Sequence, residues 1–516
     1  MKMHAAGLAG LMLVAGLQGQ ARAEETVLRV SSGASNVSTL DAHRASATDD
    51  KALVGWLYNG LVRFKPGSAD PKELEPDLAE RWETSPDGKV WTFHLRNGVK
   101  FHGDWGTLDA DDVVYSLQRA ADPKRSTFSS DFSAIDKVEK LDDLTVRVTL
   151  KYPDVNFLGR VSNYHGGNIV SRKAGEELGD RYGAKPVGTG PFTFVEQVTQ
   201  QYVKLAANPD YFRGKPKIDT IMMRAIPSDS ARELAFTSGE LDLFYGKREQ
   251  RWVDSARKRP GFNVEIFQPG EYRLLHINRS QPPLDDIRVR RAIAAAVNVD
   301  DLVRFVGKDV GPKGCSIVPP GYLGEDCSIR YGFDLAKAKA LLAEAGHKDG
   351  ITIKAIVSNI SAQQPFMEII QAQLAKAGIK LEMQVVDHAT YQSQSRKDLS
   401  GLVFYGAARF PIADTYLSEF FHSRATVGTP TAATNFSHCA VADKEIEDAR
   451  VAADAEAQKA LWKEAQRKIM DDVCAIPLFE LRQVWARSDK LDFGYELKGA
   501  LNLAPPITEK TTLKAR

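Results

Sequence analysis

The 516-residue sequence has only four cysteines and, after its first two dozen residues, no apolar run long enough to cross a membrane. It contains no GxSxG, HExxH or CxxC motif and no low-complexity tract or short tandem repeat. The formal net charge of +1 gives no general attraction to nucleic acid or to an anionic membrane surface. With 43% hydrophobic and 26% charged residues, the chain is instead typical of a globular protein of two or three domains.

Residues 1–23 have the pattern of a secretory signal peptide. Lys2 gives a short positive region, residues 5–17 are mostly apolar, and Ala21-Arg22-Ala23 is a small-x-small cleavage signal. No cysteine lies near this site to carry a lipid. We therefore expect a periplasmic protein that is exported by its signal peptide and is not lipid-anchored, with an uncleaved signal anchor as the alternative.

An even number of cysteines in an exported chain favours disulfides. Cys315 and Cys327 flank the turn-rich stretch "SIVPPGYLGED", so a local bridge is our first choice among three formal pairings and leaves Cys439 to pair with Cys474. A metal site is the competing interpretation, but the ten histidines are scattered and show no ligand spacing. We expect no metal and no cofactor.

Two strand–helix–strand patterns predict an α/β fold. The first covers residues 218–245, and the second covers residues 351–386, with Pro365 at a helix start and Gly378 at its end. Their wide separation in the sequence indicates that they belong to different lobes.

The region between the signal peptide and the first of these units has a different pattern. Residues 89–101 predict two strands around Asn97-Gly98, residues 108–122 a helix, and residues 144–153 an alternating strand. These elements predict an α+β insertion.

Arg409 is the candidate ligand-binding residue with the clearest physical reason. It follows the apolar strand that begins at Leu402, and ligands of open α/β sheets bind at the carboxyl ends of strands. A guanidinium there could hold a carboxylate or phosphate through two parallel hydrogen bonds. The alternative is a structural ion pair with a nearby Asp or Glu.

Several motifs together resemble a known family. The segments "LEPDLAERWETSPDGKVWTFHLRNGVKFHG", "LDADDVVYSLQRAADP", "PVGTGPFTF", "NPDYFRGKPKID" and "DIRVRRAIAAAVNVDDLV" are similar to those of the large extracytoplasmic solute-binding proteins of the peptide, opine and nickel class of ABC importers. The resemblance runs from about Thr26 into the C-terminal region.

This resemblance implies a two-lobed periplasmic binding protein fold with an additional α+β domain and a ligand cleft between the lobes. Domain I would combine residues 24–62, 187–275 and 488–516, domain II would be residues 63–186, and domain III would be residues 276–487. Such a protein is a monomer without enzymatic activity, which closes on its ligand and delivers it to inner-membrane ABC permease and ATPase subunits.

The resemblance also bears on the ligand. In peptide-binding members an aspartate after this strand grips the α-ammonium of the peptide, and the alignment puts Arg409 at that position and Gly406 at a usual tryptophan. An arginine would repel an ammonium group. We therefore expect an anionic or peptide-like solute such as an opine, a glutathione-like acid or a metal chelate, whereas Asp414 would restore peptide binding if the alignment is shifted.

Four further residues are candidate ligand contacts. Ser46 and Thr48 match the N-terminal loop that lines the cleft in peptide-binding members, although turn capping is an equal alternative. Phe404 and Tyr405 could stack on a ligand, although alternation directs at least one of them into the core. Two other functions stay open: a secreted hydrolase acting on peptides or glycans, and an extracytoplasmic solute sensor.

Overall fold

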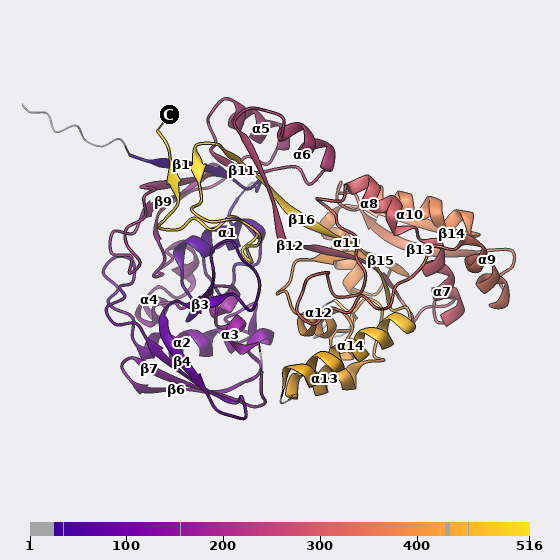
Figure 1. The fold of residues 1–516 in the computed structure, drawn as a ribbon, viewed down its shortest axis with the longest axis horizontal. Helices are drawn as coiled ribbons and strands as arrows, with labels where there is room; N and C mark the ends of the chain where they lie inside the picture. The colour runs from indigo at the N-terminus through magenta and orange to yellow at the C-terminus, as the bar shows by residue number, and fades with distance from the viewer. Residues whose placement is uncertain (1–24, 35, 155, 429–433, 453, 516) are drawn as a thin grey trace, which may run out of the picture.

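The computed structural model describes residues 25–34, 36–154, 156–428, 434–452 and 454–515. It has two lobes of helices and strands, with two long strands running between them (Figure 1). We call residues 25–261 with 489–515 the N-terminal lobe, and residues 278–474 the C-terminal lobe. The predicted signal peptide lies outside the described residues. Within the described residues, no helix is both long and apolar enough to span a bilayer.

A mixed eight-stranded sheet extends through both lobes in the order β15-β12-β16-β11-β1-β10-β9-β8. Its strands are β1 (Val27–Ser31), β8 (Phe192–Val198), β9 (Tyr202–Ala207), β10 (Thr220–Arg224), β11 (Leu243–Tyr245), β12 (Phe262–Ile277), β15 (Leu402–Ala407) and β16 (Ala475–Ser488). The strand–helix–strand unit predicted over 218–245 is β10, α5 (Asp229–Thr237) and β11. Because β1 pairs in parallel with both β10 and β11, this unit is a parallel crossover.

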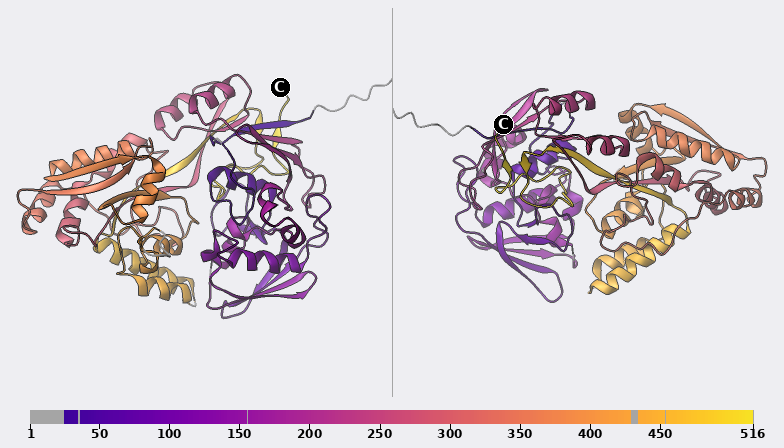
Figure 2. Two further views of the ribbon diagram at one scale, coloured as in Figure 1. Left: turned by 180° about the vertical axis from the view of Figure 1, so that it is seen from behind. Right: turned by 45° about the horizontal axis from the view of Figure 1, so that its top comes forward.

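β12 and β16 join the lobes as one antiparallel ladder, which all three views show (Figures 1 and 2). They have 16 and 14 residues, whereas an ordinary strand has about 5 to 6. The register of this ladder shifts between Phe267 and Glu271. The shift separates the part of the ladder that lies next to β11 from the part that lies next to β15. The lobes are thus joined by crossing strands. The predicted domain boundaries, which divide these two strands between domains I and III, stay a prediction.

The N-terminal lobe contains a second, antiparallel sheet in the order β4-β5-β7-β6. Its strands are β4 (Ala79–Thr84), β5 (Val90–Leu95), β6 (Ile135–Asp142) and β7 (Thr145–Leu150). The helix α2 (Ala110–Ala121) begins with a capping box, because the Asp109 carboxylate accepts from backbone N–H groups and Asp112 accepts from the N–H of Asp109. The other elements here are α1 (Thr48–Leu57), β2 (Val62–Phe64), β3 (Leu74–Pro76), η1 (Ser129–Phe132), α3 (Phe157–Arg160), η2 (His165–Gly167), α4 (Arg172–Leu178), η3 (Gly179–Ala184), α6 (Gln250–Ala256), β17 (Leu491–Asp492) and β18 (Thr512–Leu513).

The hairpin predicted around Asn97-Gly98 is wrong. Gly98 forms a turn with a φ of 75°, but beyond it Lys100 makes only an isolated bridge to Thr107. The reason is that both edges of β5 are already occupied, by β4 on one side and β7 on the other. The segment after the turn therefore has no free edge to join.

In the C-terminal lobe, the unit predicted over 351–386 is confirmed as β13 (Ile351–Ser358), α10 (Gln364–Lys376) and β14 (Ile379–Val386). The two strands pair in parallel and Pro365 lies in the first turn of the helix. The remaining elements are α7 (Ile287–Ala296), α8 (Val299–Val306), α9 (Leu335–Glu344), α11 (His388–Arg396), α12 (Ala413–Phe420), η4 (Ser423–Ala425), α13 (Asp443–Val451) and α14 (Ala455–Asp471). α3 of one lobe and α12 of the other face each other where the lobes meet (Figure 1).

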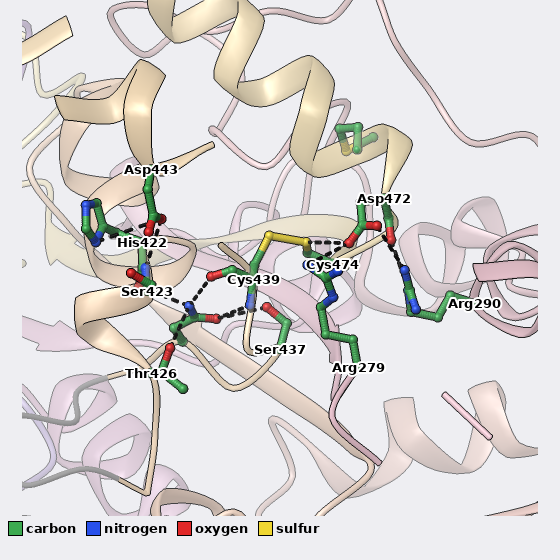
Figure 3. Close-up of a disulfide and its surroundings, with 12 residues drawn as sticks. Arg279, Arg290, His422, Ser423, Thr426, Ser437, Cys439, Asp443, Asp472 and Cys474 are labelled. Atoms are coloured by element: carbon green, nitrogen blue, oxygen red, sulfur yellow. Dashed lines mark hydrogen bonds and ion pairs between the residues drawn. A yellow bond between two sulfur atoms is a disulfide. The ribbon is translucent and has the colours of Figure 1, made fainter. Parts of the chain in front are cut away.

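Both disulfides are present in the pairing that the sequence favours, Cys315 with Cys327 and Cys439 with Cys474. The second one ties the segment before α13 to the residue that precedes β16 (Figure 3). Asn435 fixes the same segment, because its amide donates to the carbonyls of His422 and Cys439 at 3.0 and 2.8 Å. The C-terminal lobe is thus held covalently close to the point where β16 leaves it.

Candidate functional site

A pocket between the lobes is the candidate ligand site. Its empty volume, including its open mouth, is about 510 Å³. It is lined by Asp131, Phe132, Asn156, Gly159, Arg160, Tyr164 and His165 of the N-terminal lobe and by Arg409, Phe410, Ile412, Thr415 and Glu419 of the C-terminal lobe. We call it the cleft pocket. An adjoining hollow of about 1200 Å³ shares Asp131, Asn156, Arg160, Thr415 and Glu419 with it, so the two form one cleft.

Arg409 lies in the cleft pocket, two residues after the end of β15. Its Nε donates to the Glu419 carboxylate on α12, and its Nη1 donates to the Ala408 carbonyl at 3.3 Å. Its guanidinium carbon is 5.7 Å from the ring centroid of Phe420. Arg409 therefore makes the structural ion pair that the sequence left open, while its side chain stays 27% exposed toward the pocket.

Asp414 lies deeper, in the first turn of α12, and its side chain is only 6% exposed. It pairs with Arg450 of the same lobe at 3.0 Å and, across the cleft, with Arg160 at 3.9 Å. Because two guanidinium groups already occupy this carboxylate, an ammonium group would have to displace at least one of them.

The two aromatic candidates point in different directions, because consecutive residues of a strand face opposite sides. Phe404 is 1% exposed and packs against Phe366, with ring centroids 5.9 Å apart. Its assignment as a ligand contact is therefore corrected: Phe404 is a core residue. Tyr405 is half-buried against Phe436, at 4.9 Å between centroids, and it is not part of the cleft pocket lining.

Ser46 and Thr48 lie at the start of α1, exposed and half-buried respectively, and neither lines the cleft pocket. The N-cap residue is Ala47, which offers no side-chain hydrogen bond, so α1 is not capped by either hydroxyl. Their role as ligand contacts stays a prediction.

Lys51, one turn along α1, is a residue that the sequence analysis missed. Its Nζ is 5.9 Å from the Tyr164 ring centroid, at the wall of the cleft pocket. Among the described residues it makes no ion pair. Burial and the charge of Arg409 lower the pKa of Lys51 to about 8, while the charges of Asp131 and Glu419 act in the opposite direction. In the sequence Lys51 is one of many helical lysines, so no local signal identifies it.

The lobes touch at Phe410. Its ring packs across the cleft 5.8 Å from Phe64 and 6.4 Å from Tyr164, measured between centroids. A Cβ atom on Gly159 would overlap this ring, so the glycine is required for the contact. Phe410 thus fills a socket in the opposite lobe, at the edge of the cleft pocket.

Two α/β lobes that are joined by crossing strands and meet around a small-molecule cleft define a two-lobed binding protein. Residues 73–428 match the family described as "Bacterial extracellular solute-binding proteins, family 5 Middle". The chain therefore belongs to the family 5 solute-binding proteins, of the peptide, opine and nickel class, as the sequence motifs predict. Family members are periplasmic binding proteins rather than enzymes.

Individual relatives bind different solutes. The chain is 31% identical over 454 residues to Di/tripeptide-binding protein 2 of Pseudomonas aeruginosa (strain UCBPP-PA14), which covers 82% of this chain and 83% of the relative. It is also 31% identical over 494 residues to the glutathione-binding protein GsiB of Pectobacterium atrosepticum, with 93% of each chain covered. The solved structure of MoaA in complex with mannopinic acid, from A. tumefaciens R10, has a TM-score of 0.87 and 47% identity, and the match covers 95% of this chain and 100% of MoaA.

Proposed function

We propose that this protein captures a small anionic conjugate of the opine class, such as mannopinic acid, in the cleft pocket. The observation that carries the proposal is a pair of like charges on opposite lobes. Lys51 of α1 does not line the pocket itself but lies next to Tyr164 in its wall, and Arg409 lines the pocket from the end of β15. The 47% identity to MoaA, whose structure contains mannopinic acid, supports this ligand class over a dipeptide.

These charges also give a mechanism for closure. With the cleft empty, the two cations repel each other, and this repulsion contributes to the lowered pKa of Lys51. A carboxylate placed between them attracts both side chains, so it stabilises the closed arrangement more than the open one. A ligand shifts such an equilibrium only by this difference in affinity.

Peptide recognition through Asp414 is less compatible with the same geometry. A peptide α-ammonium at Asp414 would compete with Arg450 and Arg160, which already pair with that carboxylate. The cleft pocket also holds Arg160 and Arg409 beside the carboxylates Asp131 and Glu419, with Lys51 next to its wall. A peptide is therefore disfavoured by the competition at Asp414.

The remaining parts of the proposal concern the cellular context. We propose that residues 1–23 direct export to the periplasm, that the mature protein acts as a monomer without a lipid anchor, and that its closed form docks on inner-membrane ABC permease subunits with their ATPases. Closure would thus signal to the importer that ligand is present.

Calorimetric titration of purified protein with mannopinic acid, glutathione and glycyl-leucine tests the ligand class. We expect one mannopinic acid bound per chain, more tightly than either peptide, with the acid recovered unchanged by mass spectrometry. Tightest binding of glycyl-leucine would contradict the proposal and make Asp414 the next residue to test. Conversion of any of the three compounds would instead indicate a hydrolase.

A further inference from the structure

His165 lines the cleft pocket, and its ring is stacked between two other rings. Its centroid lies 3.9 Å from that of Phe128 and 3.6 Å from that of Tyr164, with interplanar angles of 8° and 23°. These two stacks fix the plane of the imidazole. The ring cannot leave this position without breaking them.

The backbone fixes the same residue. His165 has a φ of 48°, in the left-handed region that non-glycine residues rarely adopt. Its carbonyl accepts from the side-chain amide of Asn168 at 2.9 Å. The two glycines that follow pack closely, since a Cβ on Gly166 would overlap Phe132 and one on Gly167 would overlap the carbonyls of Ser162 and Arg160. Strained conformations of this kind persist where the surroundings over-determine them, and they cluster at ligand sites.

The stacking and the backbone contacts do not give the ring nitrogens hydrogen-bond partners. Nε2 is buried and has no hydrogen-bond partner in the described part of the chain. Nδ1 lies 3.9 Å from the Asp131 carboxylate, which is too far for a hydrogen bond. A buried polar atom without a partner is costly, so its retention in a ligand pocket calls for an explanation.

The imidazole is also uncharged. Burial lowers the pKa of His165 well below its usual range, and the charges of Lys51 and Arg409 lower it further. A neutral imidazole has one donor and one acceptor nitrogen. A hydroxyl, which both donates and accepts, can therefore pair with Nε2 in either tautomer, whereas a carboxylate can pair with Nε2 only when that nitrogen carries the proton.

We propose that His165 is a specificity-determining residue that hydrogen-bonds a hydroxyl of the ligand through Nε2, so that the pocket selects the polyhydroxylated part of a sugar-acid conjugate. The inference rests on the proposed function, and it assigns the recognition of different parts of the ligand to different residues. Arg409 and Lys51 hold the acid, and His165 distinguishes a sugar-alcohol chain from an alkyl chain. With an alkyl chain in its place, the buried nitrogen would remain unpaired in the complex, so the alkyl ligand would bind less tightly.

Two probes separate these roles. Mannopinic acid is a glutamic acid joined through its nitrogen to a sugar-alcohol chain, and N-hexylglutamic acid has the same acid with a six-carbon chain that lacks hydroxyls. We expect the unmodified protein to bind mannopinic acid more tightly than N-hexylglutamic acid by about tenfold or more, because the hexyl compound leaves one buried nitrogen without a hydrogen bond. His165→Phe, which keeps a ring for stacking and removes both nitrogens, should weaken only mannopinic acid and bring the ratio close to one.

The outcomes are distinguishable. Equal binding of both probes to the unmodified protein, or an unchanged ratio in His165→Phe, would overturn the role of His165 while leaving the proposed acid binding intact. Binding of neither probe would overturn the proposed function and the role of His165 together. Both titrations use the full mature chain.

Two further variants guard against a folding artefact. His165→Asn keeps a polar group and suits the left-handed backbone, so it tests the same ratio if the phenylalanine variant unfolds; we expect it to retain part of the preference. His94→Phe is the matched control, because His94 lies on β5 with its side chain 23% exposed, on the face opposite the buried Phe93. It should leave both affinities unchanged. Loss of the ratio in His94→Phe as well would show that the effect is not specific to His165.

Discussion

The two walls of the cleft differ in how far their polar groups are already paired. On the C-terminal wall, Arg409 pairs with Glu419, and Asp414 pairs with Arg450. On the N-terminal wall, Lys51 makes no ion pair among the described residues and His165 has a buried nitrogen without a partner. One wall is therefore complete without ligand, and the other is not.

This difference indicates where binding energy is gained. A group that is already paired must exchange one partner for another, so the net gain is small, whereas an unpaired buried group recovers the whole of its lost hydration. We therefore expect the C-terminal wall to act as a preformed template and the N-terminal wall to supply the additional contacts that drive closure. The predictions below test this division.

The largest effect on affinity should come from Arg409→Ala, because this substitution removes a contact to the acid and also leaves Glu419 without its partner, a cost that an exchange of partners on binding does not carry. Truncating one member of a buried charged pair costs on the order of 2 to 5 kcal/mol. Because the side chains of Arg409 and Glu419 are 27% and 31% exposed, the loss should lie at the lower end, at roughly 30-fold in the affinity for mannopinic acid. Calorimetric titration measures it.

Glu419→Gln is the matched control for that experiment. It breaks the same ion pair but leaves the arginine charge free, so binding of the acid should be retained or strengthened. If both substitutions weaken binding equally, the Arg409–Glu419 pair is a structural unit and not a ligand clamp.

The preformed C-terminal wall depends on the disulfide between Cys439 and Cys474, which closes a loop of 35 residues. Replacing both cysteines by serine should lower the free energy of unfolding by about 4 kcal/mol on the loop-entropy estimate. The Cys315–Cys327 loop has only 12 residues, so its removal should cost less, about 3 kcal/mol. Chemical denaturation of the two double variants measures the difference. A larger loss for the shorter loop would contradict this ranking.

Contact between the walls is tested at Gly159. Gly159→Val places atoms where Phe410 packs in the socket, and overpacking of this kind costs typically 1–3 kcal/mol. We expect the lobes to be held apart, with mannopinic acid binding weakened by roughly tenfold or more. Small-angle X-ray scattering with saturating acid should show a larger radius of gyration than for the unmodified protein.

The double variant Gly159→Val with Phe410→Ala distinguishes the socket from a local folding defect. Removing the ring should restore space, so the double variant should bind more tightly than Gly159→Val alone. Absence of any such rescue would mean that the glycine matters only within α3.

The features that the sequence predicts correctly are those fixed by neighbouring residues. Pro365 and Gly378 delimit α10 through local backbone preferences, and the flanking strands β13 and β14 follow from alternation. The hairpin at Asn97-Gly98 fails because strand pairing is decided by which edges are free, and β4 and β7 already occupy both edges of β5. Local pattern alone cannot express that competition.

The residues of the site also differ in whether the local sequence can identify them. Arg409 could be chosen because it follows a strand end, and Phe404 was misassigned because alternation does not say which of two adjacent residues faces the core. Lys51 and His165 give no local signal. Their unpaired state arises only when α1, the turn at 165–168 and the opposite lobe come together, so it is a property of the assembled cleft.

The smallest effect concerns the charge of Lys51 and its dependence on pH. In the free protein the pKa of Lys51 is lowered to about 8, and Arg409, Asp131 and Glu419 are the charged groups that act on it. A bound carboxylate would raise this pKa, so the contribution of Lys51 to affinity should be complete below about pH 8 and should decline as the pH rises above it. The decline cannot exceed tenfold, or about 1.4 kcal/mol, per pH unit. Titrations with mannopinic acid between pH 6.5 and 9.5 measure it, and Lys51→Arg, which stays charged throughout, should bind with little dependence on pH. A decline that persists in Lys51→Arg would assign the titrating group to another residue or to the amine of the ligand, and it would remove Lys51 from the N-terminal wall's contribution to closure.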